Sequence, residues 1–414
     1  MEKRNILIVS YYFPPNKSVG ARRWAKFSKY LQRKGHNVVV ICAENPTNSN
    51  SPWDKDIEGM NIHTLPVKYP AILFSNPSSL LNKIKYKLSV KYLQLTTKGT
   101  IYDQTLFWEK QLLTKAHELI KENNIDTVIT NGPPFRLLYY CTKLKQSFPN
   151  IKLISDFRDP WTWWYNMGYP QLKGKDKAIE FKMEEEVINL SDLVLTPNDV
   201  MQKILIEKYP SRQPFIKELP HAYDGDEFFA KDKQGQKKAN GKLNLIYFGT
   251  LYNGLEDEYR LFSKALKSAE NDVNLDIYTN QFDYQNVFHE DDLDEVVHFK
   301  RAIPMSNLSE IIANYDYVVI LSPDFGKENI STKFFEIINF RIPFLFISKP
   351  GKASRFIEDN SLGIHLEAAA LQAQFESIVN NTHEFVYNRE FDVEPYSFDK
   401  QTDNLLQYIS GLKE

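Results

Sequence analysis

The chain contains 414 residues, of which 42% are hydrophobic and 25% are charged. This composition is typical of a globular protein, and the length exceeds what one hydrophobic core usually serves, so we expect two domains. The formal net charge of -2 excludes a general attraction for nucleic acid, so an anionic partner would need a local basic patch. Cys42 and Cys141 are the only cysteines, which excludes a disulfide framework and a thiolate metal site.

Neither a membrane span nor a signal peptide is predicted. The sequence has no run of about 18 apolar residues, the length that a bilayer span needs. The stretch from Asn5 to Ser10 already has the pattern of a buried strand, which leaves no place for a leader. Together with the low cysteine content, this favours a cytoplasmic protein.

The chain opens with the pattern of a βαβ unit. Its strand, loop, helix and second strand are expected at Ile6–Val9, Pro14–Gly20, Ala21–Arg33 and Val38–Cys42. The unit lacks the G-x-G-x-x-G fingerprint and a P-loop lysine, so neither a dinucleotide-binding fold nor an ATPase is supported. Gly20 lies at the helix start with Arg22 and Arg23 directly behind it, so the loop can form an anion site. The alternative is that both arginines are solvated on the outer face of the helix.

The segment from Gly59 to Tyr102 has no acidic residue. Its lysines lie among apolar and aromatic residues, at positions Lys68, Lys83, Lys85, Lys87, Lys91 and Lys98. Such a segment can lie in the interface of an anionic membrane. Equally, it can be a helical insertion that covers the flank of a domain and leaves its lysines solvated. Nucleic acid is a less favoured partner, because the segment has no arginine and no nucleic-acid-binding module is recognisable.

Polar and aromatic residues follow two predicted strands, Thr127–Thr130 and Lys152–Ser155. Gly132 follows the first strand, and Asp156, Arg158, Asp159 and Trp161 follow the second. Ligands of open parallel sheets bind at the carboxyl ends of the strands. Carboxylates, a guanidinium group and tryptophan faces can bind sugar hydroxyls or a phosphate there. The alternative is a buried Asp–Arg pair beside a packed aromatic corner.

A change of domain is predicted near residues 219–228, where the alternation of strands and helices stops. Residues 231–242 have the polar, lysine-rich composition of a linker. Asp224 and Asp226 form an Asp-x-Asp pair, but two carboxylates without further ligands do not predict a metal site. Beyond the linker, strands are expected at Leu243–Phe248, Leu275–Tyr278, Val296–Phe299, Tyr317–Leu321 and Ile342–Ile347. Two successive βα arrays predict an α/β protein with two doubly wound, Rossmann-like domains facing a cleft.

The stretch Ser322–Phe346 has the pattern of a strand end, a loop and a helix that begins near Ser331 or Thr332. A helix N-terminus suits a phosphate, and Lys333 adds a positive charge in the first turn. Glu328 and Glu336 flank this helix start. The alternative is an ordinary helix whose carboxylates are solvated.

The sequence resembles the GT-B glycosyltransferases of family 4, of the bacterial polysaccharide or glycolipid type, over nearly its whole length. The resemblance lies in Gly20–Arg23, Gly35–His36, Asp156–Trp161, Asp192, Leu219–Asp224, Tyr247–Gly249 and above all Glu328–Glu336. The family's Asn-Gly-x-Asp linker is replaced here by His221, Ala222 and Tyr223 before Asp224. The arginine and lysine usual behind the first strand of the nucleotide domain are replaced by residues 250–254.

This resemblance implies an acceptor-binding domain at 1–222, a nucleotide-sugar-binding domain at 223–395, and a C-terminal helix within 396–414 that packs towards the first domain. Glu336 would bind the ribose, and Glu328 would lie beside the transferred sugar as a catalytic carboxylate. The remaining donor-binding residues would be Ser331, Thr332, Lys333, Gly249, Thr250, Arg301, Gly20 and Arg23. Asp159 would contact the acceptor hydroxyl or act as base, with His221 as the alternative. The remaining acceptor-binding residues would be Asp156, Arg158, Trp161 and Gly132.

The expected function is a retaining, hexosyltransferase-like transfer from a nucleotide-sugar donor to a glycan or lipid-linked acceptor, in cell-surface polysaccharide synthesis. No metal or other cofactor is expected, and no nucleic acid partner. Segment 68–98 would give peripheral contact with the inner face of the cytoplasmic membrane. Two alternatives remain open at this point: an epimerase or hydrolase of nucleotide sugars on the same fold, and a catalytically inactive binding protein.

Overall fold

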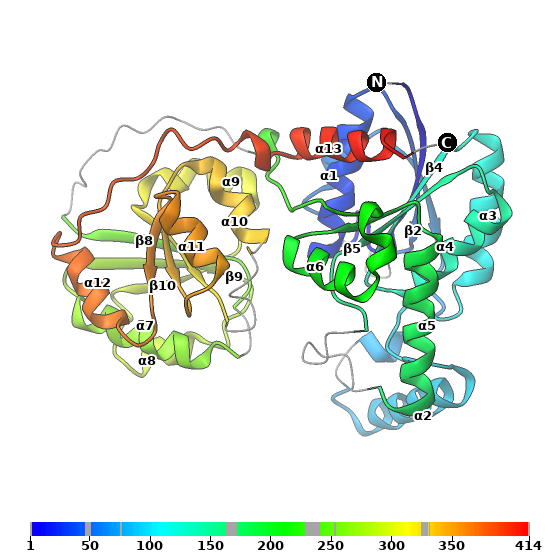
Figure 1. The fold of residues 1–414 in the computed structure, drawn as a ribbon. Helices are drawn as coiled ribbons and strands as arrows, with labels where there is room; N and C mark the ends of the chain where they lie inside the picture. The colour runs from blue at the N-terminus through cyan, green and yellow to red at the C-terminus, as the bar shows by residue number, and fades with distance from the viewer. Residues whose placement is uncertain are drawn as a thin grey trace. The chain divides into compact units, whose positions relative to one another are not determined.

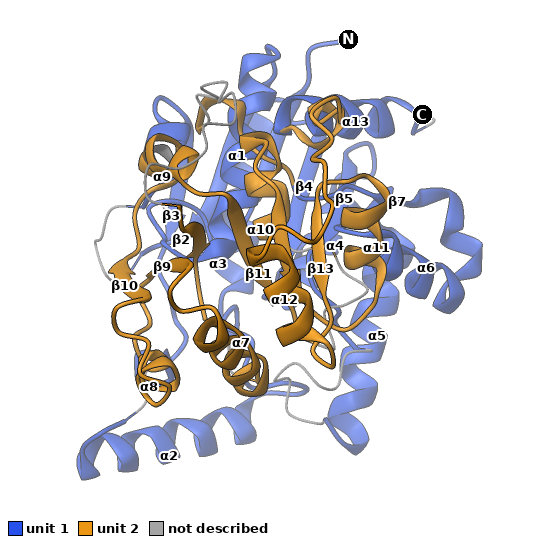
Figure 2. Ribbon diagram, turned by 90° about the vertical axis from the view of Figure 1, so that its left-hand side faces the viewer, with its two compact units in different colours: residues 1–221, 398–414 blue, residues 222–397 orange. Residues whose placement is uncertain are grey.

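The computed structural model describes residues 2–45, 51–74, 77–162, 172–227, 241–251, 254–323, 330 and 332–412. The chain divides into two compact units (Figure 2). Unit 1 comprises Met1–His221 with Phe398–Glu414, and unit 2 comprises Ala222–Ser397. Each unit is a parallel β-sheet with helices on its faces (Figure 1).

Unit 1 contains a seven-stranded sheet in the order β3-β2-β1-β4-β5-β6-β7. The strands are β1 Asn5–Val9, β2 Asn37–Ala43, β3 Asn61–Leu65, β4 Thr127–Gly132, β5 Lys152–Phe157, β6 Leu193–Thr196 and β7 Ile216–Glu218. The helices are α1 Val19–Arg33, α2 Leu80–Thr96, α3 Glu109–Glu122, α4 Arg136–Ser147, α5 Gly174–Leu190, α6 Asp199–Lys208 and α13 Phe398–Ser410. All neighbouring strands pair in parallel.

Unit 2 contains a six-stranded parallel sheet in the order β10-β9-β8-β11-β12-β13. The strands are β8 Leu243–Phe248, β9 Val273–Thr279, β10 Val297–Arg301, β11 Tyr317–Leu321, β12 Phe344–Ile347 and β13 Gly363–Leu366. The helices are α7 Glu256–Ser268, α8 Gln285–His289, α9 Met305–Ile311, α10 Thr332–Ile337, α11 Lys352–Asp359 and α12 Leu371–Val379. Both units also contain short 3-10 helices. They occur at Asp54–Ile57, Ala71–Phe74, Pro210–Phe215, Gly225–Glu227, Ile312–Asn314, Ile338–Phe340 and Glu394–Tyr396. Among the helices of the described residues, none is long and apolar enough to cross a bilayer.

Successive strand residues face opposite sides of each sheet, so both faces carry a hydrophobic core. In β8, Leu245 and Tyr247 pack in one cluster with residues of α7 and α12. The alternate residues Ile246 and Phe248 pack in another cluster with Phe334 of α10. The prediction of two doubly wound α/β domains is therefore confirmed.

Helix α13 joins unit 1 although it is the last helix of the chain. Its first residue, Phe398, is fully buried, and its ring lies 5.1 Å from that of Phe27 in α1. The guanidinium group of Arg22 lies 5.3 Å from the centre of the Phe398 ring. These contacts cover the face of α1 that would otherwise meet solvent, and residues 21–31 of α1 are all buried.

The strand order fixes where a ligand can bind in each unit. In unit 1 the chain winds outward in opposite directions from the adjacent strands β1 and β4. In unit 2 the same reversal falls between β8 and β11. At the carboxyl ends of two such neighbouring strands, the connecting loops run to opposite faces of the sheet and leave a crevice between them.

Candidate functional sites of the two units

A buried ion pair lies beside the switch point of unit 1. The Arg23 Nε donates to Asp156 Oδ2 at 2.9 Å, and the indole Nε1 of Trp24 donates to the same oxygen at 2.8 Å. Arg23 Nη2 also donates to the carbonyl oxygen of Leu219 at 2.7 Å. Asp156 is 0% exposed and Arg23 is 2% exposed. The ion pair therefore connects α1, β5 and the segment that directly follows β7. The alternative interpretation, in which both arginines are solvated on the outer face of the helix, is wrong because both are buried.

Arg158 connects the two loops that leave β1 and β4. Its Nη1 donates to the carbonyl oxygen of Gly20 at 2.7 Å, and its Nη2 donates to that of Pro133 at 3.0 Å. A Cβ atom on Gly20 would lie 2.9 Å from Arg158 Nη1, so a larger residue there would displace the guanidinium group. Burial lowers the pKa of Arg158, and the carboxylates of Asp159 and Asp156 oppose that shift. The predicted site residues Gly20 and Arg158 are therefore in direct contact, where the segments that follow β1 and β4 approach each other.

Asp159 and His221 are the two titratable side chains proposed as candidate bases. Asp159 is exposed as a whole residue, but desolvation of its carboxyl group by the surrounding protein raises its pKa above the ordinary value. Asp156 adds to the rise, and Arg158 opposes it. The pKa of His221 is lowered well below its usual value, first by burial and then by Arg23, Arg22 and Arg158. His221 is therefore a neutral imidazole at physiological pH and a weaker base than an ordinary histidine.

Trp161 and Gly132 form part of the core. Trp161 is 4% exposed, its ring stacks on Phe135 at 5.2 Å, and its Nε1 donates to Glu180 Oε2 at 2.8 Å. A Cβ on Gly132 would lie 2.7 Å from the Phe135 ring, so glycine permits this packing. This arrangement is the packed aromatic corner that the sequence offered as its alternative. The proposed acceptor contacts of Trp161 and Gly132 stay predictions.

The switch point of unit 2 brings a glycine, a lysine and a tyrosine ring together. Gly249 directly follows β8 with a φ of 105°, a conformation that other residues rarely adopt. A Cβ there would lie 3.2 Å from Lys333 Cε. The Lys333 Nζ lies 4.0 Å from the centre of the Tyr247 ring. Glu336 follows Lys333 by three residues in α10, so the two side chains lie on neighbouring parts of one helix face.

Two hydrogen bonds fix the turn that follows β8, beside Lys333 and the Tyr247 ring. The Tyr247 hydroxyl donates to the carbonyl oxygen of Thr250 at 2.6 Å, and the Gly249 amide donates to that of Tyr278 at 2.9 Å. A cation over the face of a buried aromatic ring gains electrostatic attraction from that ring. Lys333 is therefore placed beside an exposed turn of backbone where an anion can approach.

Arg301 lies apart from this group. It ends the edge strand β10, which β9 separates from β8. Neighbouring strands are about 4.8 Å apart, so the end of β10 is roughly 10 Å from that of β8. Arg301 is exposed there.

Part of the predicted donor site lies outside the described residues. Glu328 and Ser331 fall there, as does the side chain of Thr332. Helix α10 begins at Thr332, where the sequence predicted a helix start. Sequence reasoning missed Trp24 as the second donor to Asp156, and Tyr247 as the platform of Lys333. Both have the apolar spacing of core residues, and their polar contacts join positions far apart in the chain.

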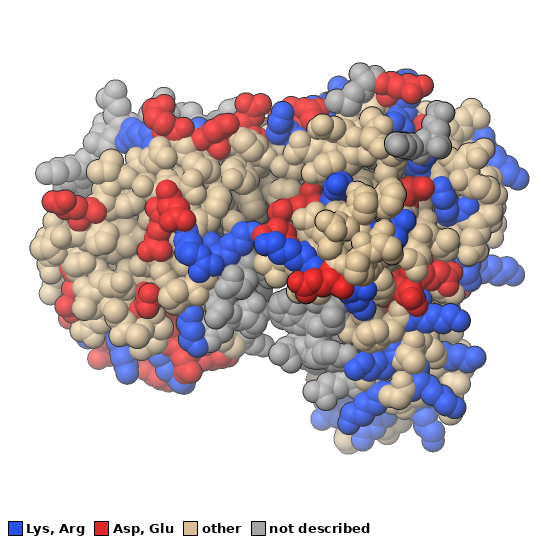
Figure 3. Space-filling view, in the orientation of Figure 1, with Lys and Arg blue, Asp and Glu red and all other residues tan. Residues whose placement is uncertain are grey.

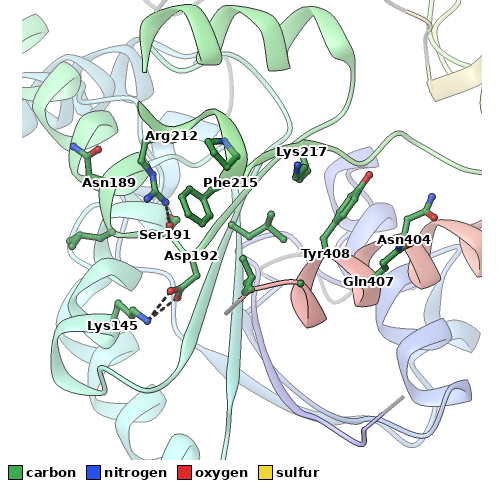
Figure 4. A pocket seen from close by; sticks show the side chains of 15 residues that line it. Lys145, Asn189, Ser191, Asp192, Arg212, Phe215, Lys217, Asn404, Gln407 and Tyr408 are labelled. Atoms are coloured by element: carbon green, nitrogen blue, oxygen red, sulfur yellow. Dashed lines mark hydrogen bonds and ion pairs between the residues drawn. The ribbon is translucent and has the colours of Figure 1, made fainter. Parts of the chain in front are cut away.

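A groove of about 1060 Å³ lies at the opposite edge of the unit 1 sheet, beside the amino ends of β6 and β7 (Figure 4). Lys145, Asp192, Arg212 and Tyr408 are among its lining residues. Lys145 pairs with Asp192 at 2.9 Å, and Arg212 Nε donates to the carbonyl oxygen of Ile188 at 3.1 Å. The groove lies at the amino ends of its strands and the candidate sites lie at carboxyl ends, so the groove is separate from them.

Two doubly wound parallel sheets, each with a switch point at its carboxyl edge, define a protein of two Rossmann-like domains. This is the GT-B fold, and comparison with solved structures bears it out. HepE from Anabaena, solved in complex with UDP and glucose, matches with a TM-score of 0.64 at 12% identity, over 99% of this chain and 100% of that one. A glycosyltransferase from Rickettsia africae matches with a TM-score of 0.60 at 15% identity, over the whole of both chains.

The same fold occurs in a protein described as an epimerase. A putative UDP-N-acetylglucosamine 2-epimerase from Listeria monocytogenes matches with a TM-score of 0.54 at 12% identity, over 98% of this chain and 95% of that one. No family model and no curated protein sequence matches the chain. At these identities the likeness establishes the fold, and the reaction must be argued from the sites.

Proposed function

We propose that the protein is a glycosyltransferase that uses a nucleotide-sugar donor. The observation that carries this proposal is the group at the switch point of unit 2, where Lys333 is held over Tyr247 beside the bare backbone of Gly249. A diphosphate needs positive charge and close backbone approach, and this group offers both. The solved GT-B structure that contains UDP and glucose supports the same assignment.

Each donor-binding residue has a distinct chemical role in this proposal. Lys333 binds the diphosphate, and the carboxylate of Glu336 accepts hydrogen bonds from the two ribose hydroxyls. Gly249 and Thr250 form the turn that faces the diphosphate. Ser331 and Thr332 complete the phosphate contact, and Glu328 stabilises positive charge at the anomeric carbon. No metal is needed, because the protein itself supplies the positive charge.

The acceptor side belongs to unit 1. Asp159 is the proposed base, because its raised pKa brings it closer to that of a proton acceptor working near neutral pH. His221 is the alternative, because its depressed pKa keeps it neutral. Arg158, Asp156 and Arg23 position this group. By its resemblance to family 4, the enzyme would be retaining and hexosyltransferase-like.

The proposed acceptor is a glycan or a lipid-linked sugar in cell-surface polysaccharide synthesis. A lipid-linked acceptor requires contact with a membrane, and the lysine-rich segment 68–98 supplies a surface for it. The protein would then work in the cytoplasm, at the inner face of the cytoplasmic membrane.

The second candidate function is epimerisation of the nucleotide sugar, which the Listeria structure of the same fold favours. Both functions need the same donor site, so donor binding does not separate them. A thermal-shift screen with nucleoside diphosphates and their sugars would first identify the donor, because a ligand at 100 times its Kd stabilises by about 2.7 kcal/mol. The donor would then be incubated with and without a membrane lipid extract, and the products identified by mass spectrometry.

A glycosyltransferase yields a sugar-modified lipid or glycan only when the acceptor is present. An epimerase or hydrolase changes the donor when no acceptor is added, which would overturn the proposal. A protein that binds the donor and forms no product in either incubation would be an inactive binding protein.

A further inference from the structure

We propose that the outward face of α2 is a docking surface for an anionic lipid bilayer. The proposal names the residues and orientation of a membrane contact and does not depend on the transferase activity, because vesicle binding needs neither donor nor acceptor. The fold leaves an apolar strip of α2 exposed. The strip consists of Leu80, Leu81, Ile84, Leu88, Tyr92 and Leu95, with exposed fractions between 54% and 80%.

The strip is one face of the helix. Its members recur at spacings of three, four and seven residues, which places them in a row along α2. The opposite face packs on unit 1, where Leu93 is fully buried in a cluster with Tyr69 and Leu106. The helix is therefore apolar on two sides, and among the described residues only the Leu93 side packs on the protein. A soluble domain rarely exposes a continuous apolar surface of this kind without a partner.

The exposed strip is fixed in its orientation. Directly after α2, the Gly99 amide donates to Asp176 Oδ1 at 2.9 Å, and the Thr100 amide donates to Glu180 Oε1 at 2.8 Å. Both carboxylates belong to α5. Glu180 also accepts from Trp161 and pairs with Arg136 at 3.2 Å, so the attachment reaches the core of unit 1. The C-terminal end of α2 is therefore anchored to unit 1.

The charges around the strip select a lipid partner over a protein one. Lys83, Lys87 and Lys91 lie along one side of the strip, and Lys85 lies along the other; all four are exposed. Residues 59–102 contain no carboxylate. Figure 3 shows basic side chains with uncharged surface between them over this part of unit 1. Lysines beside an apolar strip can reach anionic headgroups while leucines enter the acyl boundary.

The dimensions and the flanking aromatic rings fit the same partner. A helix of 17 residues is about 25 Å long, so the strip can lie flat in the interface. The Tyr92 ring lies 6.1 Å from that of Phe107, which is 39% exposed. Tyrosine is enriched at membrane interfaces because its ring is apolar and its hydroxyl is polar. Figure 2 shows α2 at the periphery of unit 1, projecting from its body.

The test is flotation of the full-length protein with vesicles of phosphatidylcholine alone or mixed with phosphatidylglycerol. The wild type should float with the anionic vesicles, and high salt should reduce its binding. The variant I84E/L88E should lose about tenfold or more, since two exposed apolar side chains of the strip become charged and can no longer enter the acyl boundary. The variant K83Q/K87Q/K91Q should lose roughly a factor of five per lysine.

Matched controls lie elsewhere on the chain. L261E/V386E places two glutamates at exposed apolar positions outside α2, and K121Q/K203Q/K264Q removes three exposed lysines outside α2. Both controls should float like the wild type. Flotation that is equal in all variants, or absent in the wild type, would overturn the proposal. A dimer that light scattering detects without vesicles, and that I84E/L88E abolishes, would also overturn it by assigning the face to a second copy.

Discussion

Asp156 accepts three hydrogen bonds from Arg23 and Trp24, two side chains of α1, and is 0% exposed. Replacing it by asparagine would keep its shape and leave the buried charge of Arg23 without compensation. We expect Asp156→Asn to lower the free energy of unfolding by about 3 kcal/mol, measured by urea denaturation. Asp159→Asn is the matched control, since that side chain is exposed, and it should cost less than about 0.5 kcal/mol. Equal stability of the two variants would contradict the structural role of the pair.

Gly249 and Gly254 form a natural comparison. Both have a positive φ, of 105° and 87°, so alanine at either position should lower the free energy of unfolding by about 1 kcal/mol. Only at Gly249 would the added Cβ meet Lys333; at Gly254 no heavy atom lies within 4 Å. Gly249→Ala should therefore weaken nucleoside diphosphate binding about tenfold by calorimetry, because a lost charge-assisted contact is worth about 1.5 kcal/mol. Equal affinities of the two alanine variants would refute the proposed approach of the diphosphate.

His221 should make stability depend on pH. Its pKa is lower in the folded protein than in the unfolded chain, so the unfolded chain binds more protons as the pH falls below about 6.5. The contribution of His221 is thus fully present above that pH and is lost on acidification towards the folded pKa. Urea denaturation at pH 7.5 and 5.5 should show a smaller loss for His221→Gln than for the wild type. The same loss in both proteins would rule out a depressed pKa at this residue.

Helix α13 should stabilise unit 1 through its packing on α1. Phe398 is fully buried against Phe27, with Tyr30 and the Arg22 guanidinium beside it. Phe398→Ala should lower the free energy of unfolding by about 3–5 kcal/mol and raise amide exchange in α1. Gln407→Ala, at an exposed position of α13, should leave both measurements unchanged. Unaltered exchange in α1 would mean that α13 does not hold it.

The elements that sequence reasoning predicted best are those buried on both faces. Runs such as Ile6–Val9 and Leu243–Phe248 are continuous and apolar, and the structure places strands at both. The edge strands β3 and β7 were not predicted, because each has only one strand neighbour and polar or half-buried residues interrupt its apolar pattern. Helix α2 was left between two interpretations, because its apolar residues occupy two faces and the sequence alone does not say which face meets the protein.

At the scale of the whole molecule, the sequence predicted candidate site residues at the carboxyl ends of strands, and it missed which of these side chains contact one another. Arg23 was assigned to the donor, yet it pairs with Asp156, 133 residues away. Trp161 was assigned to the acceptor, yet it packs in the core of unit 1. Such pairings depend on the sheet order, which local patterns do not encode. Lys333 and Gly249 were both predicted, and the structure adds the aromatic ring that joins them.

The central claim is that Lys333 binds the diphosphate of a nucleotide-sugar donor. Isothermal titration calorimetry should compare full-length wild type, Lys333→Met and Lys264→Met with the nucleoside diphosphate that the thermal-shift screen selects. Methionine keeps an unbranched chain over Tyr247 and removes the charge, and Lys264 is an exposed lysine of α7. Lys333→Met should weaken binding about 10- to 100-fold, while Lys264→Met stays within about twofold of the wild type. Equal affinity of Lys333→Met and the wild type would contradict the assignment of the donor site.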